Sequence, residues 1–154
     1  MNKLDIFESA CIKEFGYLSD FGFSLVDSKK DNYGCSLTYK NKWLALRVSM
    51  DRDGISVVFF KLLNNEIPSY PIFFDPNDEF LVFNADDLLS AKKQKAFEQV
   101  TSRLYEKLYL KVKVKEYAEL LRLHAADMFL GNFAVLEKIK ELVVRRWCEL
   151  KHEQ

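Results

Sequence analysis

Residues 39–62 carry the pattern that most constrains the fold, two apolar runs separated by a short polar turn. Apolar side chains alternate with other residues over 44–50, which is the period of a strand with one buried face. Asp-Arg-Asp-Gly follows at 51–54, where glycine tolerates the positive φ of a type I turn closed by a bulge. The return run, 55–63, is apolar on both faces around 57–60. It predicts the central strand of an antiparallel hairpin, covered on both sides.

Further elements are predicted ahead of this hairpin. Apolar residues recur every three or four positions over 3–20 and predict a helix, with Gly22 in the left-handed position that follows it. Short strands are predicted at 23–26 and 33–39, with a polar loop between them. Together with the hairpin they make an antiparallel meander of about four strands.

A proline-containing loop is predicted after the meander. All three prolines fall within 64–79, and proline removes a backbone donor and favours extended geometry before it. Short extended pieces are predicted at 72–74 and 80–83. Asn84 is then expected to cap a helix over 85–91, and the aspartate at the third helical position completes the cap.

The rest of the chain is predicted to be helical, from apolar stripes over 97–108, 117–128 and 136–150. Lysines alternate with apolar residues over 110–115, which indicates either a join between helices or a short edge strand, where lysines are common. The predicted fold class is α+β in a single domain, 1–154. It has an N-terminal helix, an antiparallel meander of about four strands, and C-terminal helices packed on the sheet.

The cysteines and the absence of long apolar runs bear on location. Cys11, Cys35 and Cys148 lie far apart in apolar patterns, so we expect reduced core residues and a cytoplasmic protein. No apolar run approaches the roughly 18 residues of a membrane span. The N-terminus carries acids where a signal peptide has an apolar core, so we expect no membrane partner.

The sequence predicts no catalytic residue and no cofactor. His124 lies on an apolar stripe, where a histidine is usually a hydrogen-bonded core residue, and His152 lies near the C-terminal end. Nucleophile motifs, glycine-rich phosphate loops and clustered zinc ligands are all missing from the sequence. Metal-dependent nucleases often carry an acid two residues before a strand lysine, but Phe59 occupies that position before Lys61. We therefore expect a protein that is not an enzyme.

Two acidic clusters resemble metal sites only in part. Asp51 and Asp53 precede a glycine at the fourth position, whereas a calcium-binding EF-hand loop needs glycine at its sixth. Turn formation explains both this pair and the acidic cluster at 75–79. We predict no metal, and a metal-dependent hydrolase that uses Asp51, Asp53 and 75–79 is the weakest alternative.

The net charge of zero hides an acidic middle segment. Residues 51–90 hold eight acidic and two basic residues, whereas 91–154 hold fourteen basic and nine acidic ones. Loops often carry function, and a shared acidic surface would steer a cationic partner to aromatic anchors. The predicted partner-binding residues are Asp51, Asp53, Asp75, Asp78, Glu79, Asp86, Asp87, Trp43 and Tyr70. The alternative interpretation is that turns and helix starts favour aspartate and that the aromatic residues belong to the core.

The basic C-terminal half does not predict a nucleic-acid partner. Its lysines alternate with acids along each helix, as over 137–141, which is typical of a solvated, salt-bridged face. Basic residues without interspersed acids occur only over 92–95 and 111–115. A chain with balanced charge and two such short clusters is a poor nucleic-acid binder.

Residues 7–62 contain two segments whose layout carries a resemblance, YLSDFGFSL and YGCSLTYKNKWLALRVSMDRDGISVVFF. This region is similar to small bacterial immunity proteins of toxin–immunity systems. In those proteins a leading helix ends in a Gly-Phe-type turn, and a strand pair and an acid-bearing hairpin follow. The resemblance implies a protein that blocks one cognate toxin by direct contact, and the acidic segment implies a cationic toxin. The alternative is a non-catalytic adaptor or structural subunit, either as a single chain or as a homodimer.

Overall fold

The computed structural model describes residues 2–71, 74–92 and 106–152. The helices are α1 (Lys3–Glu14), the 3-10 helix η1 (Gly16–Phe21), α2 (Ala85–Ala91), α3 (Glu106–His124), α4 (Ala126–Phe129) and α5 (Leu136–His152). The strands are β1 (Ser24–Lys30), β2 (Cys35–Lys40), β3 (Leu44–Asp51), β4 (Gly54–Lys61) and β5 (Val82–Asn84). The fold is α+β, as predicted.

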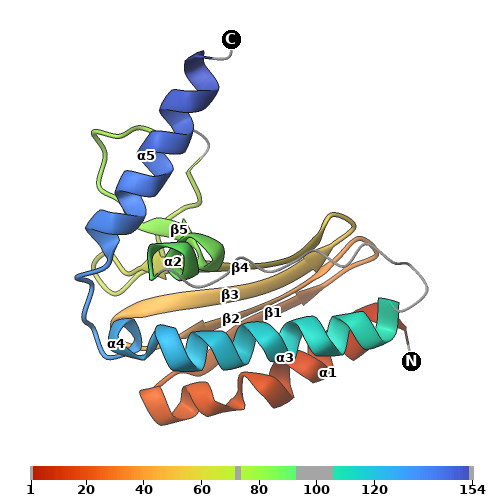
Figure 1. Ribbon diagram of the computed structural model, residues 1–154. Coiled ribbons are helices and arrows are strands. Elements are labelled where there is room, and N and C mark those ends of the chain that lie inside the picture. The colour runs from red at the N-terminus through yellow and green to blue at the C-terminus, as the bar shows by residue number, and fades with distance from the viewer. Residues whose placement is uncertain (1, 72–73, 93–105, 153–154) are drawn as a thin grey trace.

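The five strands form one antiparallel sheet in chain order, β1-β2-β3-β4-β5. α1 and α3 lie side by side along one face of this sheet, and α2 lies next to β5 and β4 (Figure 1). α5 leaves this body and stands away from the sheet (Figure 1). The meander therefore has one more strand than the sequence predicts, because the extended piece before Asn84 pairs with β4.

The main core lies between the sheet and the α1–α3 layer. The ring of Phe129, on α4, packs against aromatic rings from other parts of this core. Its centre lies 5.2 Å from that of Phe21, 5.3 Å from that of Phe23 and 6.3 Å from that of Phe59. Edge-to-face and tilted ring pairs add stability beyond the area that they bury. The chain reversals at η1 and α4 are thus fixed against β1 and β4.

Asn41, at the β2–β3 turn, is a buried polar residue whose side chain is fully used. Its Nδ2 donates to the carbonyls of Phe21, at 3.1 Å, and Phe129, at 2.9 Å. Its Oδ1 accepts from the backbone N–H groups of Trp43, at 2.8 Å, and Leu44, at 3.0 Å. One amide therefore links the turn to η1 and α4 and satisfies four buried or half-buried polar groups.

The second face of β4 carries a smaller core. Val58 and Phe60 are buried there with Ala45 of β3, under residues of the β4–β5 connection and of β5 itself. Those covering residues are Leu62, Ile67 and Val82. The prediction of a central strand covered on both sides is confirmed.

Two N-terminal boundaries differ from the prediction. The helix predicted over 3–20 ends at Glu14 and continues as η1, and Gly22 takes the predicted left-handed conformation with φ of 79°. β1 runs to Lys30, so the polar loop predicted after Val26 is wrong over most of its length. The polar residues of β1 stay in the ladder because they pair with β2 and because Lys30 bonds Asp5 of α1 at 2.7 Å.

Three predictions in the C-terminal half need correction. The lysine-rich segment is neither a helix join nor an edge strand, because α3 runs through it without a break. Cys148 is exposed rather than part of the core, whereas Cys11 and Cys35 are buried as predicted. Asn84 occupies the N-cap position of α2, but its side chain makes no capping hydrogen bond. Residues 72–73 and most of the predicted helix at 97–108 lie outside the described residues.

Candidate binding surface on the C-terminal arm

The acids of the β3–β4 hairpin lie at its tip and serve the turn. Asp51 Oδ1 accepts from the backbone N–H of Asp53 at 2.7 Å, and Asp53 forms a 4.0 Å ion pair with Arg52. All three side chains are exposed. Exposed turn groups of this kind contribute little to stability, so they are free to bind a partner.

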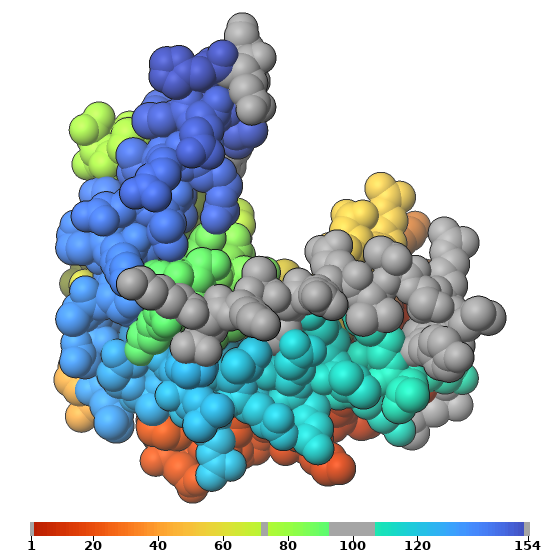
Figure 2. Space-filling view, in the orientation of Figure 1, coloured from red at the N-terminus to blue at the C-terminus, as the bar shows by residue number. Residues whose placement is uncertain are grey.

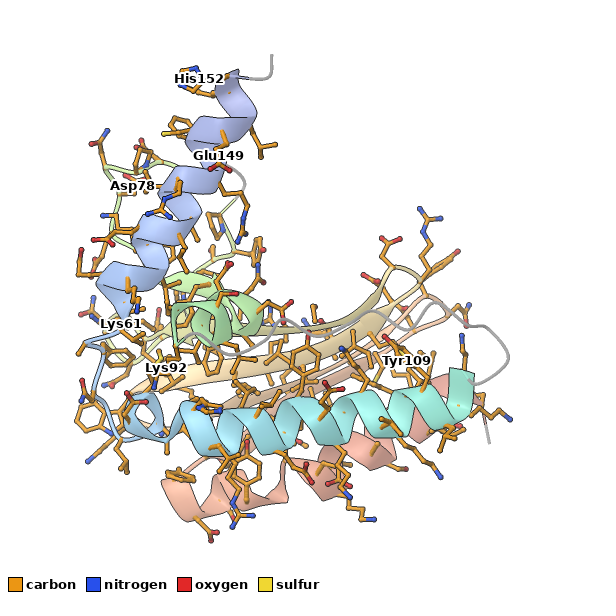
Figure 3. The ribbon with its side chains drawn as sticks, in the orientation of Figure 1. Lys61, Asp78, Lys92, Tyr109, Glu149 and His152 are labelled. Atoms are coloured by element: carbon orange, nitrogen blue, oxygen red, sulfur yellow. The ribbon has the colours of Figure 1, made fainter. Side chains whose placement is uncertain are left out.

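The acids of the β4–β5 loop lie at the other end of β4. Eight residues of β4 separate Asp53 from this loop, which is about 25 Å at the rise of a strand. Figure 3 places Asp78 beside α5, on the side turned away from the hairpin. The prediction that all seven carboxylates share one surface is therefore wrong. The two groups also cannot hold one metal ion, which removes the hydrolase alternative that uses both.

Asp86 and Asp87, at the start of α2, each bond to a side chain of another helix, but only Asp87 is buried. Asp86 accepts a 2.9 Å hydrogen bond from the hydroxyl of Tyr117 on α3. Asp87 is only 5% exposed and forms a 2.7 Å ion pair with Arg146 on α5. Both carboxylates thus join α2 to other helices, and Asp87 is not available to a partner. The sequence missed this because Arg146 is 59 residues away from Asp87.

The two predicted aromatic anchors differ in their surroundings. Trp43 is 40% exposed, and its ring packs against Gly131, where a Cβ atom would come within 2.8 Å. Lys42 lies over the same ring at 4.7 Å. Tyr70, in the β4–β5 loop, is 58% exposed. Trp43 therefore supports the fold, whereas Tyr70 is the better candidate anchor.

We use the term arm for α5 together with the described parts of the β4–β5 loop, residues 64–71 and 74–81. The arm rises from the body, and a wide hollow separates α5 from the β3–β4 hairpin (Figure 2). Among the described helices and strands, α2 is the main contact of α5. A helix supported at its base and along one side leaves much of its surface open to other molecules.

The apolar stripe of α5 becomes less covered along the helix. Ile139, near its base, is fully buried, and Trp147 is half-buried with its ring edge-to-face with Phe74 of the loop at 6.1 Å. Leu150, one turn further, is 57% exposed. The stripe therefore extends beyond the part of the fold that covers it. The sequence contained this signal, since the stripe was predicted over 136–150, but not how far the fold would cover it.

The loop of the arm is acidic throughout. Residues 64–81 contain four acids and no lysine or arginine. Glu66, Asp75, Asp78 and Glu79 are all exposed. Asp75 Oδ1 accepts from the backbone N–H of Asn77 at 2.9 Å, and the carbonyl of Asp75 accepts from Asp78 at 3.1 Å. Turn formation thus holds Asp75 and Asp78 together on the arm, and Glu79 follows them directly in the chain.

Cys148 gives the arm a distinct chemical group. It is exposed on α5, whereas burial raises the pKa of the Cys11 and Cys35 thiols above the ordinary value. Because the thiolate is the reactive form, the two buried thiols are unreactive. Of the three cysteines, Cys148 alone therefore reports on access to the arm.

A group of ionisable residues lies buried between α2 and α3. Burial raises the pKa of Tyr117 well above its usual range, and Asp86 adds to this effect. Burial also lowers the pKa of Lys113, which Glu116 and Asp86 partly oppose. The Lys113 amine lies 5.4 Å from the centre of the Tyr117 ring. Because α3 is an unbroken helix, the Lys113 side chain is buried in the fold, while its neighbours Lys111 and Lys115 are exposed.

The described residues form neither a metal-binding cluster nor a membrane-spanning helix. Within residues 2–71, 74–92 and 106–152, no three acidic, histidine or cysteine side chains gather as a metal ion would require. Among the described helices, none has the length and apolar character of a membrane span. No family model, no curated protein and no solved structure matches this chain.

Proposed function

We propose that this protein binds and neutralises a cognate bacterial toxin by direct contact, and that the toxin docks on the arm. The supporting observation is that an incompletely covered apolar stripe on α5 adjoins a loop with four acids and no basic residue. Protein interfaces combine apolar and aromatic anchors with a polar, charged rim. The arm has both parts within one projecting structure.

The two parts have separate roles in binding. Covering the exposed part of Leu150, which is 57% exposed, contributes about 1–2 kcal/mol, which mainly slows dissociation. Asp75, Asp78 and Glu79 attract a cationic partner over a distance and raise the association rate, most strongly at low salt. Loss of the acids is therefore expected to slow association, and a charge at Leu150 to speed dissociation.

The sequence resemblance supports the class of function but not the position of the site. It covers residues 7–62, which end before the loop and α5 begin. Such immunity proteins differ greatly in their contact residues, so no binding residue is carried over. The assignment of the arm rests on its geometry and charge.

The test is capture of the partner by the tagged full chain from a lysate of its native host, followed by mass spectrometry. Two arm variants are compared, Leu150→Glu and the triple variant Asp75→Asn, Asp78→Asn and Glu79→Gln. The control is Asp51→Asn with Asp53→Asn, which removes exposed carboxylates from the opposite end of β4. The captured protein is then expressed alone and together with the chain.

The proposal predicts one captured protein that arrests growth alone and is harmless when co-expressed with the wild-type chain. Both arm variants lose this protection, and the hairpin control keeps it. Protection by the arm variants together with loss of protection by the hairpin control would place the site elsewhere. A captured protein that is not toxic would reject the immunity function.

The exposed stripe of α5 also supports a second candidate, a homodimeric adaptor in which two arms pair. Light scattering over a range of concentrations distinguishes the two. A dimer that Leu150→Glu converts to a monomer favours the adaptor, and a monomer at all concentrations favours the toxin-binding function.

A further inference from the structure

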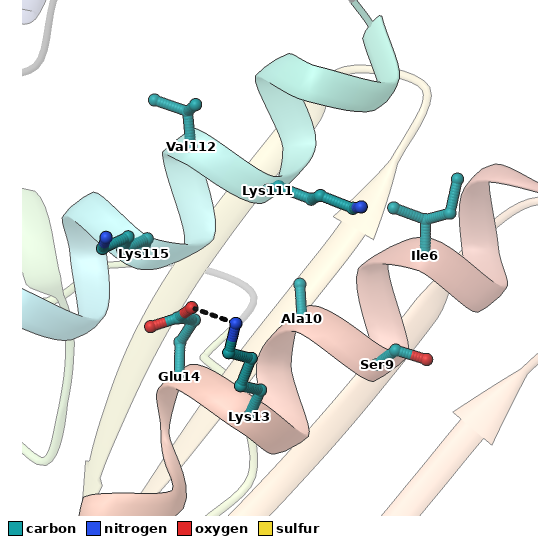
Figure 4. Close-up of a pocket in the computed structure, with 8 residues that line it drawn as sticks. All are labelled: Ile6, Ser9, Ala10, Lys13, Glu14, Lys111, Val112 and Lys115. Carbon is teal, nitrogen blue, oxygen red and sulfur yellow. Dashed lines mark ion pairs between the residues drawn. The ribbon is translucent and has the colours of Figure 1, made fainter.

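A second surface, on the opposite layer of the molecule from the arm, has a different chemistry. α1 and α3 lie side by side, and a groove of about 490 Å³ runs between them. Its lining residues are Ile6, Ser9, Ala10, Lys13, Glu14, Lys111, Val112 and Lys115 (Figure 4). Every one of these side chains is among the described residues, and the groove is separate from the proposed toxin-binding arm.

The groove has an apolar floor. Ile6 and Ala10 of α1 are buried at its base, at 8% and 9% exposure, and Val112 of α3 is 53% exposed beside them. Elsewhere on the same two helices, Ile12 of α1 and Leu108 of α3 are 54% and 61% exposed. The α1–α3 layer therefore presents exposed aliphatic side chains to solvent next to a recess that can accept others.

The rim of the groove is basic. Lys13, Lys111 and Lys115 surround the floor, and Figure 4 shows Lys111 reaching from α3 toward Ile6 on α1. The acids nearby neutralise them only weakly, because Lys13 lies 4.0 Å from Glu14 and Lys115 lies 3.9 Å from Glu119. Pairs of this length at exposed positions contribute little. The rim thus keeps a positive potential around an apolar recess.

The basic rim forms because α3 runs through the alternating lysine segment as one unbroken helix. Lys111 and Lys115 are four residues apart, so they lie on one face of α3, and Val112 lies next to them. Lys113 points into the core instead. As a strand, the same sequence would have placed all three lysines on one face and Val112 on the other.

We propose that the α1–α3 groove binds an acidic amphipathic helix of another protein. Such a helix places apolar residues at i, i+3, i+4 and i+7 into the recess and sets its flanking carboxylates against the lysine rim. Charge complementarity selects this occupant, since three lysines surround the floor with one glutamate. The proposal does not depend on the function of the arm.

The test uses two synthetic helical probes of roughly 18 residues with the same leucine face, one flanked by glutamate and one by lysine. Binding to the full chain is measured by fluorescence anisotropy at about 50 mM salt, where charge effects are strong. The expected dissociation constant for the acidic probe is on the order of 10–100 µM. The lysine probe should bind at least tenfold more weakly, since like charges oppose it.

Matched variants locate the binding. Lys111→Gln with Lys115→Gln should weaken the acidic probe by about tenfold, which is about 1.4 kcal/mol. Lys138→Gln with Lys140→Gln removes the same charge from α5 and should leave affinity within about twofold. Circular dichroism and thermal unfolding confirm that both variants fold. Glutamine avoids the new repulsion with Glu119 that a charge reversal would create.

Three results would overturn the proposal. Equal binding of the two probes would show apolar adhesion without charge selection. Equal loss in both double variants would show a general charge effect rather than a site. Binding to vesicles of phosphatidylcholine and phosphatidylglycerol, with no binding of the acidic probe, would assign the surface to anionic lipid instead.

Discussion

The attachment of α5 to the body gives the most quantitative prediction. Arg146 of α5 donates to Asp87 of α2 at 2.7 Å, and the Asp87 side chain is 6% exposed while that of Arg146 is 58% exposed. Arg146→Ala leaves the buried carboxylate without this charge-assisted bond. A hydrogen bond to a charged group is worth about 1.5–3 kcal/mol, and breaking a fully buried pair costs about 3–5 kcal/mol. Since Arg146 is more than half exposed, we expect a loss of about 2 kcal/mol.

The two partners should respond unequally. Asp87→Ala removes the buried charge and leaves Arg146 to water, so we expect a loss below about 1 kcal/mol. Adding Asp87→Ala to Arg146→Ala should therefore restore about 1 kcal/mol of stability. The control, Arg145→Ala, changes an exposed neighbour and should stay within about 0.5 kcal/mol of wild type.

Urea unfolding at neutral pH measures these differences. With a slope of about 2 kcal/mol per molar, Arg146→Ala should lower the midpoint by about 1 M without changing the slope. An equal urea midpoint for Arg146→Ala and Arg145→Ala would refute this prediction. It is also refuted if the double variant is less stable than Arg146→Ala alone.

Three further predictions concern the fold. Gly131→Ala should lower the free energy of unfolding in urea by about 2 kcal/mol, because φ is 91° and a Cβ would meet the Trp43 ring. The control, Gly16→Ala, has open space around the added Cβ and should be neutral. Equal effects of the two substitutions would contradict this prediction. Asn41→Asp should cost at least about 3 kcal/mol by thermal unfolding, because it replaces the donor to two carbonyls with a charge, and a loss below 1 kcal/mol would contradict it. Burial lowers the pKa of Lys113, so the charged form destabilises the fold below its folded-state pKa and this penalty disappears as pH rises toward 10.5. Wild type should thus gain stability relative to Lys113→Met as pH rises toward 10.5, and a constant difference would contradict the sign.

Local sequence patterns predicted most of the sheet. Alternation defined β2 and β3, and the glycine at 54 takes the positive φ that its turn requires. Sequence periodicity predicted the wrong structure where contacts between residues far apart in the chain determine it. The polar residues after Val26 form a strand because β2 and α1 bind them, and nothing local indicates this.

The candidate site was predictable only in part. Turn-forming aspartates were identified correctly as surface groups at Asp51, Asp53, Asp75 and Asp78. Their separation follows from the length of β4, and an antiparallel strand places successive turns at opposite ends of a sheet. The burial of Asp87 depends on Arg146, which no local pattern indicates. The exposed end of the α5 stripe depends on how much of the helix the fold covers.

The central claim is that a partner docks on the arm, and thiol labelling tests it most directly. The rate of maleimide reaction at Cys148 is compared with that of a thiol introduced at the hairpin tip by Arg52→Cys, where the native side chain is 94% exposed. With the captured partner in saturating amount, labelling at Cys148 should slow by roughly tenfold or more, while the hairpin thiol reacts at its free rate. Protection of the hairpin thiol with an unchanged rate at Cys148 would contradict the account.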